Sequence, residues 1–383
     1  MKMIESIVKL LQRDTGKKKL IPEIDGLRTL ALLPVIFMHF NTNYKRYLGN
    51  SLGEGYENIV NNGERGVFLF FAISGFILSL GFYNILNKGN EIDYKNYLLR
   101  RLTRLEPPFI ISTLALFFMV QFGFEGGWRA LLDHLLPTLT YTHHLIFGYW
   151  SPINPVTWSL EVEIQFYLLI PFFCVFLFAK SERYRLILLS VMVIIIPLLF
   201  IHEGSFFLKN PHLKRSLPVF CSHFLIGLLF LNLYTSSFWT KFKNSYIWDF
   251  FGIVAILTFV GGHFGESRLL ETFVLDALIL LIFVSVFKGV ILNRLFSLKA
   301  VVIFGGMCYS IYLLHYPIFF GVSKISKYVV LKDNSLNYIF QFALAFGIMF
   351  TLASIFFILF EKPFMKNDWW RFRKKGNQSV AEK

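Results

Sequence analysis

Arg28 and His39 lie in the first long apolar segment of the chain, at a spacing that could serve chemistry. They are eleven residues apart, which on a helix of about 100° per residue is roughly three turns plus 20°, so both side chains point the same way. Arginine binds anions and histidine moves protons near neutral pH. Because ionisable groups are costly inside a membrane, a shared face indicates function. The alternative is an arginine that extends to the interface and a core histidine bonded to another helix.

Arg101 and Arg104 come just before the third apolar segment, within Arg100-Arg101-Leu102-Thr103-Arg104. Three residues apart, they would share one helix face and present two planar guanidinium groups suited to phosphate oxygens. The alternative is ordinary positive charge on the cytoplasmic side of a membrane protein. The pattern predicts a phosphate-bearing cytosolic ligand.

Glu161 and Glu163 follow Trp158 where the fourth apolar segment begins. On a helix these two carboxylates are about 200° apart, so at most one of them faces a given cavity. A glutamate there could hold a histidine by a hydrogen bond and stabilise the imidazolium that forms when the histidine takes a proton. The alternative is a carboxylate that interacts with the dipole of the first helical turn.

Tyr312 and His315 lie three residues apart on one face of the ninth apolar segment, where helix packing is the alternative to a functional role. No phosphate-binding loop, nucleotide-binding glycine pattern, nucleophile elbow or zinc signature occurs in the sequence. We therefore expect no metal and no permanently bound cofactor.

The composition excludes an ordinary soluble domain, because 55% of the 383 residues are hydrophobic and only 16% are charged. The net charge of +14 comes from short Lys and Arg clusters between apolar runs, which is typical of a membrane protein rather than a nucleic-acid-binding one. Membrane-spanning helices need about 20 mainly apolar residues. We predict an all-α, polytopic membrane helix bundle of about ten spans, with ranges 24–43, 66–86, 107–122, 163–179, 186–202, 217–234, 246–263, 269–287, 301–322 and 336–361.

The distribution of basic residues predicts the orientation. With both termini inside, cytoplasmic segments hold 26 of the 38 Lys and Arg residues and external segments hold 11. The domain organisation is then a cytoplasmic N-terminal segment 1–23, a transmembrane domain 24–361 and a basic cytoplasmic tail 362–383. The long external stretch 123–162 is expected to be an interfacial loop or a re-entrant element.

Six short motifs follow one another along the chain. They are Ile24-Asp25-Gly26-Leu27-Arg28 with His39, the run GVFLFFAISGFILS from Gly66, Arg101-x-x-Arg104 with Pro107, WSLEVEIQFYL from Trp158, YSIYLLHYPI from Tyr309, and Glu361-Lys362-Pro363. In this order they resemble the integral-membrane acyltransferase family 3, which includes bacterial lipopolysaccharide and peptidoglycan O-acetyltransferases. The resemblance spans nearly the whole membrane region.

This resemblance implies transfer of an acyl group, usually acetyl from acetyl-CoA, to a sugar hydroxyl of a cell-envelope glycan outside the inner membrane. It implies catalytic roles for His39 and Glu163 and donor binding by Arg28, Arg101 and Arg104. Four further residues are expected at the substrate site, namely Asp25, Trp158, Tyr312 and His315. The role of Glu161 stays open, because its position is commonly small or polar in the family.

The expected partners are acyl-CoA, a glycan acceptor and the lipid bilayer, with no nucleic acid. Many family members carry an additional extracytoplasmic hydrolase-like domain, which is not seen in this sequence, so we expect the protein to act alone or with a separate extracytoplasmic partner protein. A different reading is a transporter or flippase that uses Arg28, His39 and Glu163 as an ion or substrate pathway.

Overall fold

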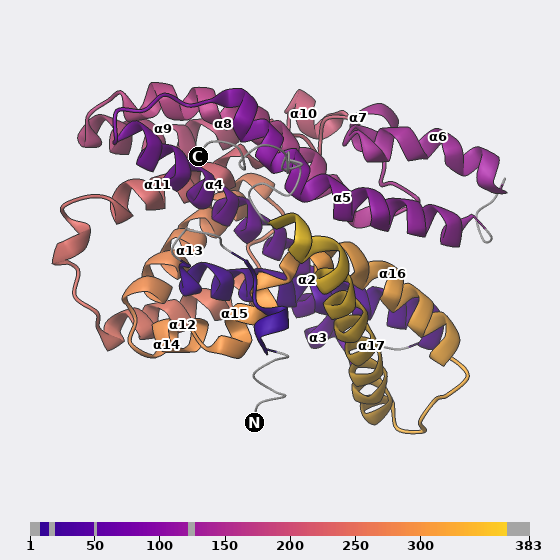
Figure 1. Cartoon of the computed structure of the whole chain (residues 1–383). Coiled ribbons are helices and arrows are strands. Elements are labelled where there is room, and N and C mark those ends of the chain that lie inside the picture. The colour runs from indigo at the N-terminus through magenta and orange to yellow at the C-terminus, as the bar shows by residue number, and fades with distance from the viewer. Residues whose placement is uncertain (1–7, 15–19, 50–51, 122–126, 366–383) are drawn as a thin grey trace, which may run out of the picture.

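The fold is a bundle of helices with no strand among the described residues, as Figure 1 shows. A computed structural model describes residues 8–14, 20–49, 52–121 and 127–365. The predicted all-α class is confirmed. Residues 1–7 and 15–19 of the predicted N-terminal segment 1–23, and residues 366–383 of the predicted basic tail 362–383, lie outside the described residues.

The long helices account for most of the described chain. They are α2 (Pro22–Leu48), α4 (Arg65–Leu86), α5 (Tyr94–Val120), α8 (Trp158–Phe178), α9 (Glu182–Phe200), α11 (Leu217–Tyr234), α12 (Tyr246–Gly261), α13 (Arg268–Lys288), α16 (Cys308–Ser326) and α17 (Asn334–Phe356). Shorter helices connect them, namely α3 (Glu54–Val60), α6 (Gly127–Leu139), α7 (His143–Phe147), α10 (Phe206–Lys209), α14 (Ile291–Phe296) and α15 (Lys299–Gly306). Single 3-10 or π turns are η1 (Asn61–Glu64), η2 (Pro155–Thr157), η3 (Trp239–Lys241), η4 (Phe357–Glu361) and η5 (Lys362–Met365).

Every one of the ten predicted spans falls on helix, but fewer helices meet a strict test for crossing a membrane. Seven described helices are long and apolar enough, and the pair α15 and α16, bent by 69°, brings the number to eight if it counts as one span. The helix α12 is a shorter apolar helix, and α2 is not among those that meet the test. The protein is therefore a multi-pass membrane protein, and the number of about ten spans stays a prediction.

The helix α5 begins earlier than predicted. The sequence indicated a span that starts at Pro107 and Pro108, yet both prolines lie inside a helix that starts at Tyr94. Asp93 caps this helix, because its carboxylate accepts the backbone N–H of Asn96 at 2.9 Å. Arg101 and Arg104 therefore both lie on α5, which their predicted shared helix face requires.

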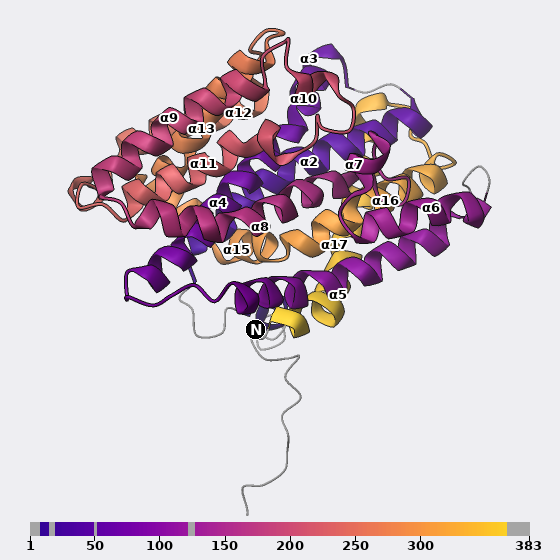
Figure 2. The same ribbon diagram turned by 90° about the horizontal axis from the view of Figure 1, so that it is seen from above.

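The helix α2 lies near the centre of the bundle and packs against α4, α15 and α16, and Figure 2 shows the helices from above. The pair α4 and α11 packs closely behind it. A Cβ on Gly75 would collide with the carbonyl oxygen of Phe224, and one on Gly227 with that of Ala72. Glycine at both positions lets the two backbones approach, as is common between membrane helices.

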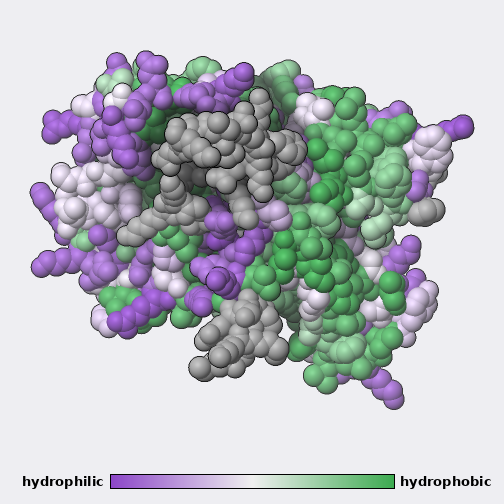
Figure 3. Space-filling view, in the orientation of Figure 1, coloured by the Kyte–Doolittle hydropathy of each residue, from purple (hydrophilic) through white to green (hydrophobic). Residues whose placement is uncertain are grey.

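The outer faces of several helices expose large apolar side chains. Leu336 and Ile339 on α17 are each 60% exposed, Phe172 on α8 is 62% exposed and Leu199 on α9 is 58% exposed. In Figure 3 hydrophobic residues cover the side of the molecule where Figure 1 labels α16 and α17. Such continuous apolar surface is compatible with lipid and not with water.

Both ends of the described chain lie on the same side of the bundle. The Lys362 ammonium donates to the backbone carbonyls of Lys9 and Leu10 at 2.9 and 2.7 Å. An even number of membrane crossings places the two ends in this way. Which compartment they face stays a prediction from the charge distribution.

Candidate active site

His39 and His315 form a hydrogen-bonded pair in the interior of the bundle. His39 Nδ1 lies 2.7 Å from His315 Nε2, joining α2 to α16 across 276 positions of sequence. The ring of Tyr316 packs edge-on against His39 at a centroid distance of 5.2 Å. His315 is fully buried and His39 is half-buried, so neither imidazole is turned to the lipid.

The backbone of α16 fixes the tautomers of this pair. His315 Nδ1 lies 2.8 Å from the carbonyl oxygen of Tyr312 and 3.1 Å from that of Ile311, and carbonyl oxygens only accept hydrogen bonds. In the neutral ring Nδ1 therefore carries the proton, and His315 Nε2 must accept from His39 Nδ1–H. The lone pair of His39 is left on Nε2. That nitrogen can serve as a general base.

Asp25 and Arg28 lie one turn apart near the start of α2, and Arg13 joins them from the N-terminal residues. The guanidinium groups of Arg13, at 2.8 Å, and of Arg28 both donate to Asp25 Oδ1. Arg28 is also within electrostatic range of Cys308, at the start of α16. Arg28 and His39 are therefore both near α16, His39 through its hydrogen bond to His315. Asp25 is 1% exposed, and its carboxylate orients both guanidinium groups through these hydrogen bonds.

Arg101 and Arg104 on α5 bring further positive charge to the same region. Arg104 is within electrostatic range of Arg13, Arg28, Arg101 and Glu361. Arg101 lies over the ring of Tyr167 at 5.4 Å. Neither Arg101 nor Arg104 makes a hydrogen bond or ion pair to another residue in the part of the chain that the structure describes. We call Arg13, Arg28, Arg101 and Arg104 the arginine cluster.

Glu163 lies on α8 beside Tyr167, and it does not hold His39. Its carboxylate accepts the hydroxyl groups of Ser74 and Tyr167. The hydrogen bond of His39 goes to His315 instead, and none joins Glu163 to His39 within the described ranges. We hypothesised that a glutamate such as Glu163 orients His39, but the hydrogen-bond partner that orients His39 is His315.

Trp158 and Tyr312 lie away from the arginine cluster, where α8 begins beside α16. The Tyr312 hydroxyl donates to the carbonyl of Val156 at 2.9 Å and accepts from Ser159 at 2.7 Å. The guanidinium of Arg215 lies 4.1 Å from the centre of the Trp158 ring. Burial, and secondarily the charge of Arg268, lower the pKa of Arg215 to about 10. Both Trp158 and Tyr312 are buried.

Glu161 has a structural task. Its carboxylate accepts the backbone N–H of His144 at 2.9 Å, which anchors the short helix α7 on α8. The preceding residue His143 lies 3.0 Å, ring nitrogen to ring nitrogen, from His134 on α6. Burial, followed by the neighbouring His134, lowers the pKa of His143 to about 4. Within the predicted external stretch 123–162, the described residues from Gly127 onward thus include the packed helices α6 and α7. Their interfacial or re-entrant position stays a prediction.

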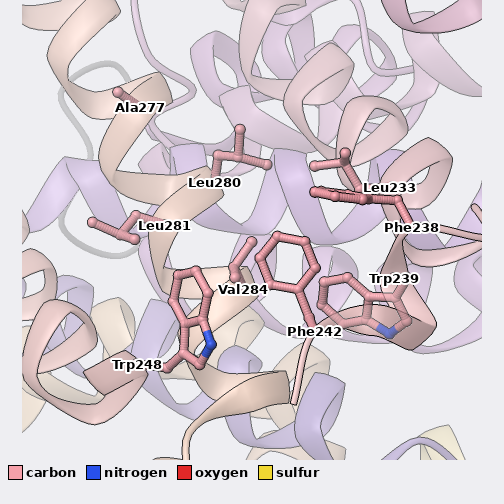
Figure 4. Close-up of a pocket in the computed structure, with 9 residues that line it drawn as sticks. All are labelled: Leu233, Phe238, Trp239, Phe242, Trp248, Ala277, Leu280, Leu281 and Val284. Carbon is pink, nitrogen blue, oxygen red and sulfur yellow. The ribbon is translucent and has the colours of Figure 1, made fainter. Parts of the chain in front are cut away.

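A cavity lined by apolar side chains lies elsewhere and carries no chemistry. It has a volume of about 300 Å³ between the ends of α11, α12 and α13, and Figure 4 shows that Trp239, Phe242 and Trp248 form its aromatic side. None of its lining side chains is an acid, a base or a nucleophile. An acyl transfer therefore cannot be assigned to it.

The contact of Arg13 with Asp25 and the pair formed by His223 and Asp276 were not predicted from the sequence. Arg13 lies in a polar segment where nothing in the sequence indicates a contact with Asp25. His223 on α11 and Asp276 on α13 are both buried and 2.6 Å apart. The signal for this second pair was present, since an ionisable side chain within an apolar run requires a partner.

Comparison with known proteins defines the class. The sequence model of the acyltransferase domain family matches residues 21–358, so the chain belongs to this acyltransferase family 3. It is 25% identical over 91% of its length to "Putative O-acetyltransferase SACOL0978" of Staphylococcus aureus (strain COL). It is 26% identical over 46% of its length to peptidoglycan O-acetyltransferase OatA of Listeria monocytogenes. No solved structure matches the chain.

The chain spans 58% of the length of the staphylococcal relative and 27% of that of OatA. Membership in the acyltransferase family supports the acyltransferase class, and the matched relatives carry O-acetyltransferase names.

Proposed function

We propose that the protein transfers an acetyl group from acetyl-CoA on the cytoplasmic side of the inner membrane to a hydroxyl of an extracytoplasmic cell-envelope glycan. One observation carries this proposal. A histidine pair with a free lone pair on His39 Nε2 lies in the bundle interior, roughly 16 Å along α2 from Arg28.

The donor end of the proposal rests on unbalanced charge. The arginine cluster brings four guanidinium groups near two buried carboxylates, Asp25 and Glu361. Glu361 is itself held by the backbone N–H of Ser310 at 3.0 Å. The excess positive charge favours a polyanion, and guanidinium groups bind phosphate oxygens in bidentate geometry. The nucleotide part of acetyl-CoA is such a polyanion.

The reaction balances without another reagent. His39 Nε2 takes the proton of the glycan hydroxyl as the oxygen forms a bond to the thioester carbonyl carbon. The carbon–sulfur bond then breaks, and the imidazolium returns the proton to the thiolate of CoA. The hydrogen bond from His39 Nδ1–H to His315 holds the ring throughout. A covalent acyl-His39 intermediate is the alternative sequence of steps, with ping-pong kinetics.

The division of the site into two ends has a physical advantage. Only the acyl group and its slender pantetheine arm enter the bundle, while the charged nucleotide stays at the arginine cluster. The glycan approaches from the end where Trp158 and Tyr312 lie, with both termini of the chain in the cytoplasm. Glu163, between these ends, fixes the Tyr167 hydroxyl beside the path of the donor.

The test is direct. Purified protein in detergent micelles, where both faces are accessible, is incubated with radiolabelled acetyl-CoA and a panel of cell-envelope glycans. We expect label in one class of glycan, and equal label without the protein would remove the proposal. Initial rates at varied concentrations of both substrates separate direct transfer, with intersecting lines, from an acyl-enzyme, with parallel lines.

A further inference from the structure

The N-terminal residues preceding α2 reach the arginine cluster. The backbone carbonyls of Lys9 and Leu10 accept hydrogen bonds from Lys362, and a few residues later Arg13 donates to Asp25. Arg13 lies outside residues 21–358, the part of the chain that matches the family.

The bond to Asp25 does not use up the guanidinium of Arg13. Asp25 Oδ1 is shared with Arg28, so one carboxylate serves two cations. Arg13 Nε is buried without a hydrogen-bond partner within the described ranges. Burial, followed by the charge of Arg28, lowers the pKa of Arg13. The Nε–H of this half-buried guanidinium is an unused donor, and an anion that accepts from it stabilises the group.

A small pocket lies beside this group. Arg13 and Asp25 line it together with Lys299, at the start of α15. The pocket thus has two cations and one carboxylate, so positive charge is in excess here, as it is in the arginine cluster. The pocket therefore favours a negatively charged group over a neutral one.

We propose that Arg13 binds a phosphate group of the acyl-CoA donor, with Lys299 on the same pocket. This inference rests on the proposed function, since it names a ligand contact for the same donor. The thioester must reach His39, roughly 16 Å along α2 from Arg28, which keeps the phosphates at the level of the arginine cluster. Arg13 is then the contact that closes the donor site from the N-terminal side.

The experiment compares Arg13→Ala with the parent, using three donors with the accepting glycan held constant. Acetyl-CoA carries all phosphates, acetyl-3′-dephospho-CoA lacks one, and S-acetylpantetheine lacks the nucleotide entirely. We expect Arg13→Ala to lower kcat/KM for acetyl-CoA about tenfold or more, through KM, and to leave kcat/KM for S-acetylpantetheine unchanged. An effect that disappears with acetyl-3′-dephospho-CoA assigns Arg13 to the 3′-phosphate, and one that persists assigns it to the diphosphate.

The control is Arg183→Ala, which removes an exposed arginine from the start of α9 and is expected to change neither value. Should Arg13→Ala not yield monodisperse protein, Arg13→Gln keeps a donor toward Asp25 while removing the charge, with the same expectation. An equal loss with acetyl-CoA and S-acetylpantetheine, or no loss with either, would overturn the inference while leaving the proposed function standing. If the parent uses none of the three donors, both fall together.

Discussion

Replacing His315 by alanine removes the acceptor for His39 Nδ1–H and leaves the rest of the His39 ring in place. The hydrogen bond is 2.7 Å long and lies in the bundle interior, where no described side chain other than His315 accepts from His39. During proton transfer His39 becomes an imidazolium, and the bond becomes charge-assisted. Hydrogen bonds to charged groups contribute about 1.5 to 3 kcal/mol. At about 1.4 kcal/mol per tenfold in rate, the loss is roughly 10- to 150-fold.

The loss should fall on kcat and leave the donor KM unchanged, because the charge develops only in the transition state and the arginine cluster is untouched. His315→Gln retains a carbonyl acceptor and should recover part of the rate. The assay is acetyl transfer from labelled acetyl-CoA by purified protein, with variants matched by gel filtration.

A matched control separates chemistry from packing. Phe319 lies one turn further along α16, fully buried, with its ring 6.1 Å from that of His315. Phe319→Ala removes a larger side chain, so it should lower stability more than His315→Ala does while preserving most of kcat. Parental kcat in His315→Ala would refute the tautomer argument, and so would an equal loss in the Phe319 control.

Three further outcomes follow from the geometry. Arg104→Ala should raise the donor KM about tenfold or more at nearly constant kcat, measured by initial rates, and an unchanged KM would remove Arg104 from the donor site. Gly227→Ala should cost about 1 to 3 kcal/mol of stability, seen in thermal unfolding in detergent, because the new Cβ would collide with the carbonyl of Ala72. The pKa of His143 is about 4 in the folded protein and about 6.5 in the unfolded chain, so the folded protein keeps this imidazole neutral to a lower pH. Its contribution to stability is thus complete above pH 6.5 and is lost as pH falls toward 4. The melting temperature of His143→Gln should therefore depend less on pH in this range than that of the parent.

The sequence predicted long apolar helices well and charged helix starts poorly. The range 217–234 coincides with α11, because Ser216 and Pro218 mark its start and a continuous apolar run follows. The start of α5 was missed because its first turns carry the charges of a loop, whereas the cap at Asp93 and the packing against α8 sustain the helix. Apolar periodicity cannot detect such a segment.

In the candidate site, too, local features were predictable and long-range contacts were not. Arg28 and His39 share a face because helical periodicity is local, and this was predictable from eleven residues of sequence. The partner of His39 was not predictable, since His315 lies 276 positions away and only tertiary packing chooses it over Glu163. Arg13 was missed for the same reason, because its contact with Asp25 depends on how the N-terminal residues return to the bundle.

The transfer assay on His39 variants tests the central claim most directly. Purified parent, His39→Ala and His39→Gln are compared for acetyl transfer from labelled acetyl-CoA to the accepting glycan, with CoA binding measured in parallel. Loss of the general base should lower the rate by about 10²- to 10⁴-fold while CoA still binds, because the arginine cluster is intact. Transfer at the parental rate in either variant would contradict the account.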